Sequence, residues 1–217
     1  MNDAKLILYG YFRSSATWRV RIGLAWKGLA WETVPVHLVR SGGEQNGEEH
    51  RHRNAMAQVP VLSVDGTLLT QSVAILEYLE ERWPTPPLLP SDPIARARVR
   101  QMVEIVNSGI QPLQNLAVGK RLEADHGVDK AGVARWNTFW IAKGLDALEA
   151  AAREHAGRCL VGDAVSFADA CLVPQLFNAR RFGVSLEPYP TLMAVESTLS
   201  ALPAFIDSHP SRQPDAE

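Results

Sequence analysis

Two serines near the start of the chain stand where a small α/β domain can bind an anion. Ser14 and Ser15 follow a short apolar run, Leu6 to Tyr9, and open a segment, Ser14 to Lys27, that predicts a helix ended by Gly28. A strand that leads into a helix places the helix N-terminus, with its unpaired N–H groups and partial positive charge, at the carboxyl end of the strand. A serine hydroxyl there can donate to a bound anion, or it can simply cap the helix.

Two further places offer groups of the same kind. Gln71 and Ser72 lie between a predicted hairpin and a predicted helix, where they can hold a carboxylate or act as an N-cap. Val59 precedes Pro60, and a cis peptide there would turn the Val59 backbone N–H and C=O toward an extended peptide, although most X–Pro bonds are trans. Together the three places suit a small peptide-like ligand with a thiol and carboxylates.

The sequence lacks the motifs of the commoner catalytic sites. It has no HExxH, no Cys/His cluster at zinc spacing, no Walker A loop, no GxGxxG and no GxSxG, so no metal is expected. Cys159 and Cys171 lie in apolar stretches, which predicts two small core residues rather than nucleophiles. The net charge of −2 does not favour nucleic acid or an anionic membrane. An acid at Asp3 and a short first apolar run predict a cytoplasmic protein rather than a secreted one.

Five prolines in the eleven residues from Trp83 to Pro93 predict a linker. We expect it to divide the chain into an α/β domain, residues 1–87, and an all-helical domain, residues 88–217. In the first domain a β-α-β unit with parallel strands precedes a hairpin around Asp65-Gly66 and a further helix. The expected elements are Leu6 to Tyr9, Ser14 to Lys27, Trp31 to Leu38, Val61 to Val64, Thr67 to Thr70 and Ser72 to Arg82.

Two details of the first domain follow from composition. Pro35 removes a backbone donor, so the strand that contains it is expected at an edge of the sheet. The polar stretch from Arg40 to Ala57 predicts helix in part at most. After the linker every strong pattern is helical. Helices are expected through Val99 to Ile110 with a kink at Pro112, through Trp136 to Leu148, from a Ser166–Asp169 capping box to about Phe182, and lastly through Leu192 to Leu199.

These motifs resemble those of the zeta-class glutathione transferases over essentially the whole chain. The matching segments are Ser14 to Ile22 with Lys27-Gly28, Gln58 to Leu62, Gln71 to Ile75, Ile110 to Asn115, Asn178 to Phe182 and His209 to Asp215. One departure is Ala16, where the class usually has cysteine, so any role of that cysteine is absent. Asn54-Ala55 also departs from the usual Asn-Pro.

The resemblance implies a thioredoxin-like β-α-β, β-β-α domain followed by a helical domain that completes the substrate site, with glutathione as coenzyme in a homodimer. The class includes the enzyme that converts maleylacetoacetate to fumarylacetoacetate in tyrosine and phenylalanine degradation, so the resemblance implies a cis–trans isomerase with possible transferase activity. By motif, the implied glutathione contacts are Ser14, Ser15, Gln45, Val59, Gln71, Ser72, Gln111 and Asn115.

The chemistry requires a thiolate and cations. Thiolate addition to the double bond allows rotation, and Ser14 or Ser15 with the helix dipole would keep the glutathione sulfur ionised. The maleyl keto acid is a dianion, and we choose Arg13 and Arg181 as its cations, with surface or interdomain ion pairs as the alternative for either. The rival functions are a maleylpyruvate isomerase, a general conjugating transferase and a non-catalytic binding or regulatory protein of the same fold. The presence of both serines speaks against the last.

Overall fold

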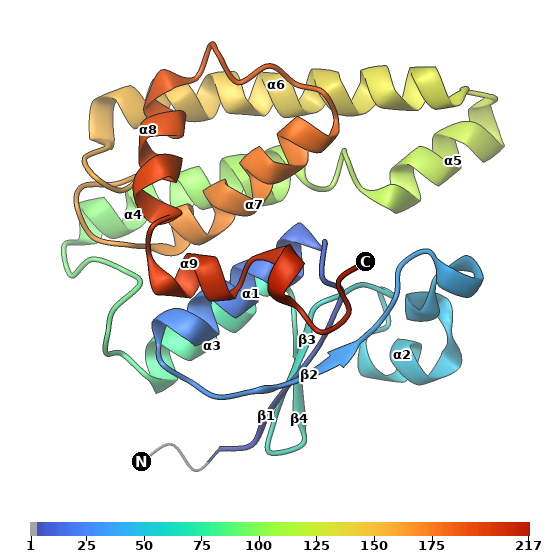
Figure 1. Ribbon diagram of the computed structural model, residues 1–217, viewed down its shortest axis with the longest axis horizontal. Coiled ribbons are helices and arrows are strands. Elements are labelled where there is room, and N and C mark those ends of the chain that lie inside the picture. The colour runs from blue at the N-terminus through green and yellow to red at the C-terminus, as the bar shows by residue number, and fades with distance from the viewer. Residues whose placement is uncertain (1–3) are drawn as a thin grey trace. The chain divides into compact units, whose positions relative to one another are not determined.

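The computed structural model describes residues 4–217, which form two compact units (Figure 1). The first unit contains the described chain up to Leu88 and also the segment Ala201–Glu217, whereas the second unit is Leu89–Ser200. The division expected from the sequence assigned everything after residue 87 to the helical domain, so the two differ in that last segment. Asp3, which entered the argument for a cytoplasmic location, lies outside the described residues.

The last segment joins the first unit through buried polar groups. The Trp18 Nε1–H donates to Ser208 Oγ at 3.0 Å, and Arg21 Nε donates to the Ser208 carbonyl at 3.1 Å. A short helix, α9 (Pro203–Asp207), packs on helix α1 (Ser15–Trp26) just before these contacts. The sequence predicted the preceding helix, α8 (Pro190–Leu199), as the last one, and that prediction was wrong because five residues are too few to show a helical period.

A mixed four-stranded sheet in the order β2-β1-β3-β4 forms the middle of the first unit. Its strands are β1 (Leu6–Gly10), β2 (Glu32–Pro35), β3 (Val61–Val64) and β4 (Thr67–Thr70). The β1–β2 pair is parallel and the β3–β4 pair is antiparallel, as the β-α-β and hairpin signals predicted, and β1 also pairs antiparallel with β3. Pro35 lies on an edge strand, and Asp65 and Gly66 form the hairpin turn with φ of 49° and 89°, values that match its left-handed requirement.

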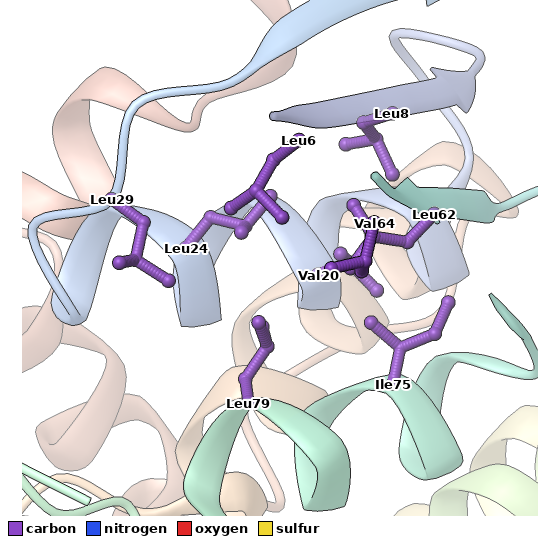
Figure 2. Close-up of a cluster of buried hydrophobic side chains, with 9 residues drawn as sticks. All are labelled: Leu6, Leu8, Val20, Leu24, Leu29, Leu62, Val64, Ile75 and Leu79. Carbon is purple, nitrogen blue, oxygen red and sulfur yellow. The ribbon is translucent and has the colours of Figure 1, made fainter. Parts of the chain in front are cut away.

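Two helices, α1 and α3 (Ser72–Arg82), cover the buried side of this sheet. Figure 2 shows side chains of β1 and β3 pointing toward those of both helices. Each fully buried aliphatic side chain stabilises such a core by about 1.5–3 kcal/mol. The cluster comprises Leu6, Leu8, Val20, Leu24, Leu29, Leu62, Val64, Ile75 and Leu79. The packing fixes the N-termini of α1 and α3 relative to the sheet.

The polar stretch after β2 is helical only in part, as expected. It contains two short 3-10 turns, Arg40–Gly42 and Glu44–Asn46, and one six-residue helix, α2 (Glu48–Arg53). His50 on α2 is buried although its neighbours in sequence are charged and polar. The stretch therefore contributes a side chain to the interior that its composition did not indicate.

The second unit is helical throughout its described elements. They are α4 (Pro93–Glu104), a π-helical turn (Ile105–Ile110), α5 (Leu116–His126), α6 (Lys130–His155), α7 (Phe167–Arg181) and α8. The expected kink near Pro112 takes the form of this wider turn, in which the Gln111 N–H donates to the Val106 carbonyl at 2.9 Å. Proline cannot continue an α-helical ladder, and the helix ends before it.

The start of α7 is sealed by the predicted capping box. Asp169 is fully buried, and its carboxylate accepts hydrogen bonds of 2.8 Å from the Leu160 N–H and from both the N–H and the hydroxyl of Ser166. Burial raises the pKa of Asp169 to about 6 despite these bonds. Cys159 and Cys171 are buried, as predicted. Within residues 4–217 no helix combines the length and apolar character that a membrane span requires.

Candidate active site

The turn between β1 and α1 carries the two serines. Ser14 is the N-cap of α1, and its Oγ accepts a hydrogen bond from the Thr17 N–H at 3.2 Å. Ser15 is the first residue of the helix and is 8% exposed. The capping interpretation is thus confirmed for Ser14, but capping uses only an acceptor lone pair of the hydroxyl. The Ser14 hydroxyl proton remains available for donation to an anion at this helix N-terminus.

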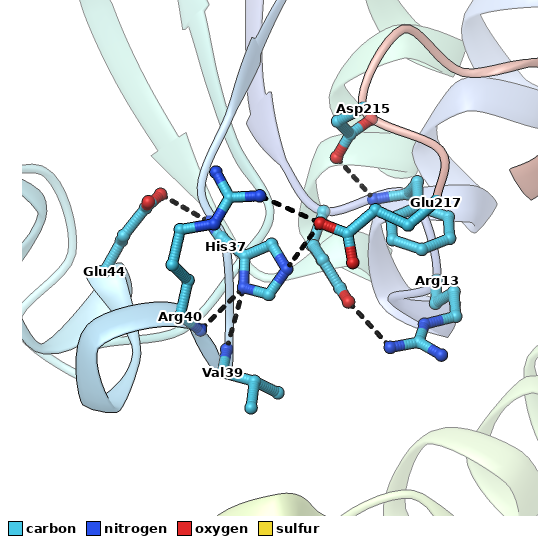
Figure 3. A network of polar contacts seen from close by, with 9 residues as sticks. Arg13, His37, Val39, Arg40, Glu44, Asp215 and Glu217 are labelled. Atoms are coloured by element: carbon cyan, nitrogen blue, oxygen red, sulfur yellow. Dashed lines mark hydrogen bonds and ion pairs between the residues drawn. The ribbon is translucent and has the colours of Figure 1, made fainter.

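Arg13 projects from the same turn. Its Nη2 donates to the Tyr11 hydroxyl at 2.9 Å, and its guanidinium carbon lies 5.0 Å from the centre of the Phe12 ring (Figure 3). A guanidinium has five N–H donors, so the single bond to Tyr11 leaves most of the fork for a carboxylate. The Arg13 residue as a whole is exposed. The two aromatic rings restrict where this cation can point.

The N-terminus of α3 differs from that of α1. Gln71 occupies the N-cap position with a φ of 69° and makes no side-chain capping bond, so its carboxamide is not used as a cap. A positive φ at a residue other than glycine is uncommon and is found more often at functional sites. Ser72 follows as a buried first helical residue, and its Oγ accepts from Arg19 Nη1 at 3.2 Å. The buried Arg19 therefore links α1 to the start of α3.

The third predicted place is the turn before β3. The Val59–Pro60 peptide is cis. The preceding carbonyl, that of Gln58, contacts two side chains from the α2 region at 2.9 Å: His50 Nε2 and Asn54 Nδ2. Sequence reasoning missed both partners, because a polar stretch of uncertain structure gave no reason to bury His50. Their bonds fix the backbone that leads into Val59.

Gln45 lies in the second 3-10 turn and is 8% exposed. Its Nε2 donates to the Leu38 carbonyl at 3.4 Å, whereas its Oε1 is buried with no hydrogen-bond donor among the described residues. A buried amide oxygen without a donor is costly, and a ligand that supplies an N–H would remove that cost. Gln45 is thus the predicted contact with the clearest unmet bonding capacity.

The remaining predicted residues belong to the second unit. Gln111 directly follows the π-helical turn, and Asn115 caps α5 by accepting from the Ala117 N–H at 2.9 Å. Arg181 is the exposed last residue of α7, with Nη1 donating to Asn178 Oδ1 at 3.2 Å. Gln111, Asn115 and Arg181 therefore come from helix ends of the second unit. All the other predicted site residues belong to the first unit.

Comparison with known proteins identifies this arrangement. Residues 4–81 match the family model of the glutathione S-transferase N-terminal domain, and residues 141–203 match that of the C-terminal domain. The chain is 51% identical over 215 residues to maleylacetoacetate isomerase of Mus musculus, covering 99% of this chain and 97% of the mouse protein.

Two solved structures extend the likeness. Maleylacetoacetate isomerase from Anaeromyxobacter dehalogenans with glutathione bound in its active site has a TM-score of 0.90 and 53% identity, with full coverage of both chains. A bacterial zeta-class transferase, maleyl pyruvate isomerase, has a TM-score of 0.93 and 40% identity, covering 97% of this chain and 100% of the other. From its two-unit fold, its two matching domain models and these full-length likenesses, the chain belongs to the zeta class of the glutathione S-transferase family.

Proposed function

We propose that the protein is a glutathione-dependent cis–trans isomerase that converts maleylacetoacetate to fumarylacetoacetate, as part of tyrosine and phenylalanine degradation. The observation that carries the proposal is the Ser14-Ser15 pair at the α1 N-terminus, in a chain that aligns over 99% of its length with a maleylacetoacetate isomerase. The buried Cys159 and Cys171 fit this reading, because the coenzyme brings its own sulfur.

The reaction needs a reversible nucleophile. The glutathione thiolate adds to the double-bond carbon β to a carbonyl, the electron pair moves onto the carbonyl oxygen as an enolate, and the former double bond becomes a single bond. After rotation the enolate reforms the double bond in the trans geometry and expels the thiolate. A hydroxyl of Ser14 or Ser15 and the α1 dipole stabilise the thiolate, each by about 1–2 kcal/mol.

The coenzyme would be held largely through main-chain and polar groups of the first unit. The Val59 backbone pairs with the peptide part of glutathione, and Gln71 and Ser72 at the α3 N-terminus bind a carboxylate. Gln45 supplies the buried Oε1 that has no donor among the described residues. Gln111 and Asn115 of the second unit complete the proposed set.

The dianionic substrate would be held by arginine. Arg13 and Arg181 are the proposed cations, since a guanidinium binds a carboxylate through two parallel hydrogen bonds. A cation near the keto oxygen also stabilises the enolate that forms after addition. In this proposal residues 1–87 form the coenzyme domain and residues 88–217 complete the substrate site. We further propose a homodimer, and a cytoplasmic location, where glutathione is kept in its thiol form.

The test is glutathione dependence. Isomerisation of maleylacetoacetate is measured with and without glutathione, in the unmodified chain and in the Cys159→Ala/Cys171→Ala variant. We expect no turnover without glutathione and near-unchanged turnover in the cysteine variant, because both thiols are buried and burial raises the pKa of Cys159 to about 12. Full activity in glutathione-free buffer would refute the mechanism.

A second candidate is a maleylpyruvate isomerase, which applies the same chemistry to a shorter acid. It is supported by the TM-score of 0.93 to maleyl pyruvate isomerase. Measuring kcat/KM for both acids separates the two, and a preference for the shorter acid would favour the second candidate. Conjugation of an electrophile without isomerisation would indicate a general transferase, and glutathione binding without any turnover would indicate a binding protein.

A further inference from the structure

Two charged side chains hydrogen-bond to the backbone of Phe12, just before the turn that carries the serines. The Phe12 N–H donates to Asp215 Oδ2 at 2.9 Å, and the Phe12 carbonyl accepts from Arg21 Nη2 at 2.8 Å. Phe12 lies two residues before Ser14, and its ring is buried. Ionic side chains from an inner turn of α1 and from the segment Ala201–Glu217 therefore fix the two successive peptide units that flank Phe12, one through its N–H and the next through its C=O.

The Arg21 guanidinium is removed from water to make this contact, which disfavours its charged form. It is 1% exposed, and burial lowers its pKa to about 10 while the charge of Asp215 opposes that shift. Its Nε also donates to the carbonyl of Ser208, a residue with no exposed surface. A buried cation is tolerated where it is hydrogen-bonded and near an opposite charge, and here two backbone carbonyls accept its hydrogen bonds while the charge of Asp215 favours its charged form.

The segment that carries Asp215 is itself held in place. Gln213 Nε2 donates to the carbonyls of Asp207 and His209, at 3.1 and 3.0 Å, which closes a compact loop around the 3-10 turn Pro210–Arg212. Ser208 anchors the start of this loop on Trp18 of α1. Asp215 is therefore presented from a fixed support rather than from a loose end.

The same segment also contacts the loop that leads to Gln45, another of the proposed glutathione contacts. Figure 3 shows dashed lines from the Glu217 carboxylate to both His37 and Arg40, with Arg40 Nη2 at 2.9 Å and His37 Nε2 at 3.4 Å from Glu217 Oε1. His37 Nδ1 accepts from the N–H groups of Val39 and Arg40 and so orders the start of the loop that leads to Gln45. These outer contacts are more exposed than the Phe12 contacts, and we assign the main effect to Asp215.

We propose that Asp215 and Arg21 are positioning residues that aim the Ser14 and Ser15 hydroxyls by fixing the backbone on either side of Phe12, an inference that rests on the proposed function. Neither side chain needs to touch glutathione. Fixing the backbone just before a helix N-terminus sets where the first helical donors point, and a shift of ~1 Å at such a site costs up to ~10²-fold in rate.

The test compares Asp215→Ala with Asp215→Asn and with Asp207→Ala. Asp207 lies in the same segment, pairs with Arg212 at the surface and has no recorded contact with Phe12, so it is the matched control. The readouts are the pKa of the glutathione thiol in the complex, followed by thiolate absorbance, the KM and kcat of isomerisation, and hydrogen exchange of the peptide spanning Phe12 to Ser15.

We expect Asp215→Ala to raise the pKa of the bound thiol by about one unit and to lower kcat about tenfold near neutral pH, with little change in the KM for glutathione. Exchange of the Phe12–Ser15 peptide should also become faster. Asp215→Asn should recover most of all three effects, because its amide oxygen still accepts from the Phe12 N–H. Asp207→Ala should behave as the unmodified chain does.

The outcomes separate the two proposals. No thiolate signal in the unmodified chain would refute the proposed function, and hydrogen exchange would still test the inference without any ligand. Equal exchange in Asp215→Ala and Asp207→Ala would overturn the positioning role. Faster exchange with an unchanged thiol pKa would also overturn it, because Asp215 would then only stabilise the fold.

Discussion

The N-termini of α1 and α7 are both preceded by a serine cap, yet they are satisfied in different ways. At α7 the buried carboxylate of Asp169 accepts from Ser166 and from Leu160, so the helix meets an anion of its own chain. The first turn of α1 contains no acidic residue, and Ser14 supplies one bond to Thr17. The positive end of α7 is thus neutralised internally, whereas that of α1 stays available for an external anion. Similar caps in sequence therefore serve stability in one unit and, in the proposed function, ligand binding in the other.

The largest effect is expected at the N-terminus of α7. Asp169→Ala leaves three buried donors without an acceptor, and each such group costs about 1–3 kcal/mol, so unfolding in urea should show a loss of about 3 kcal/mol or more. The nearby Asp163→Ala, which removes an exposed carboxylate from the Arg158 N–H, should cost far less. Similar losses in both variants would mean that the Asp169 carboxylate does not stabilise the start of α7.

An intermediate effect is expected at the other end of α7. Arg181→Ala should lower kcat/KM for the dianionic substrate by roughly ten- to a hundred-fold, because one charge-assisted bond is lost, and should leave glutathione affinity nearly unchanged. A singly esterified substrate should lose less than the dianion.

The neighbouring Arg180→Ala is the control for that prediction. Arg180 donates to Glu196 through both of its terminal nitrogens, so its loss should lower stability without changing the preference for the dianion. Equal losses for both substrates in Arg181→Ala would give Arg181 a structural role as well.

The smallest effect is expected at the N-terminus of α1. Replacing Ser14 and Ser15 together by alanine should raise the pKa of bound glutathione by about one unit, as seen by ultraviolet titration, and each single change should do less. Stability should fall by about 0.5–2 kcal/mol, the usual worth of an N-cap. Ser185→Ala, a surface serine of the second unit, should change neither quantity. If the pKa of the bound thiol does not change in the double variant, the serines at the α1 N-terminus have only a capping role, like Ser166 at the α7 N-terminus.

The parts of the fold that the sequence predicted are those with local causes. The β3–β4 hairpin and α3 have the predicted boundaries, because Asp65-Gly66 meets the backbone requirement of a tight turn and the apolar spacing of α3 is regular. The capping box of α7 is equally local. The strand-to-helix pattern placed the serines at a helix N-terminus, which the structure confirms.

The parts that could not be predicted depend on distant partners. Arg19 and Arg21 are charged residues in a helix, yet each is 1% exposed, since their partners Ser72, Ser208 and Phe12 are brought to them by the fold. The Trp18–Ser208 contact spans 190 residues, and no window of sequence reveals it. His50 is buried for the same kind of reason, through the Gln58 carbonyl.

The return of Ala201–Glu217 to the first unit has a consequence for the order of events during synthesis. Proteins emerge from the ribosome N-terminus first, so β1, α1 and α3 are made early, and the whole second unit follows before Ser208 and Asp215 appear. Until then the Phe12 N–H lacks its acceptor, and Arg21 lacks both the Ser208 carbonyl and the Asp215 charge. The serine turn thus acquires its final geometry only after the whole second unit and the segment up to Asp215 have been synthesised, which makes the proposed coenzyme contacts of the first unit depend on residues that lie beyond the second unit in the sequence.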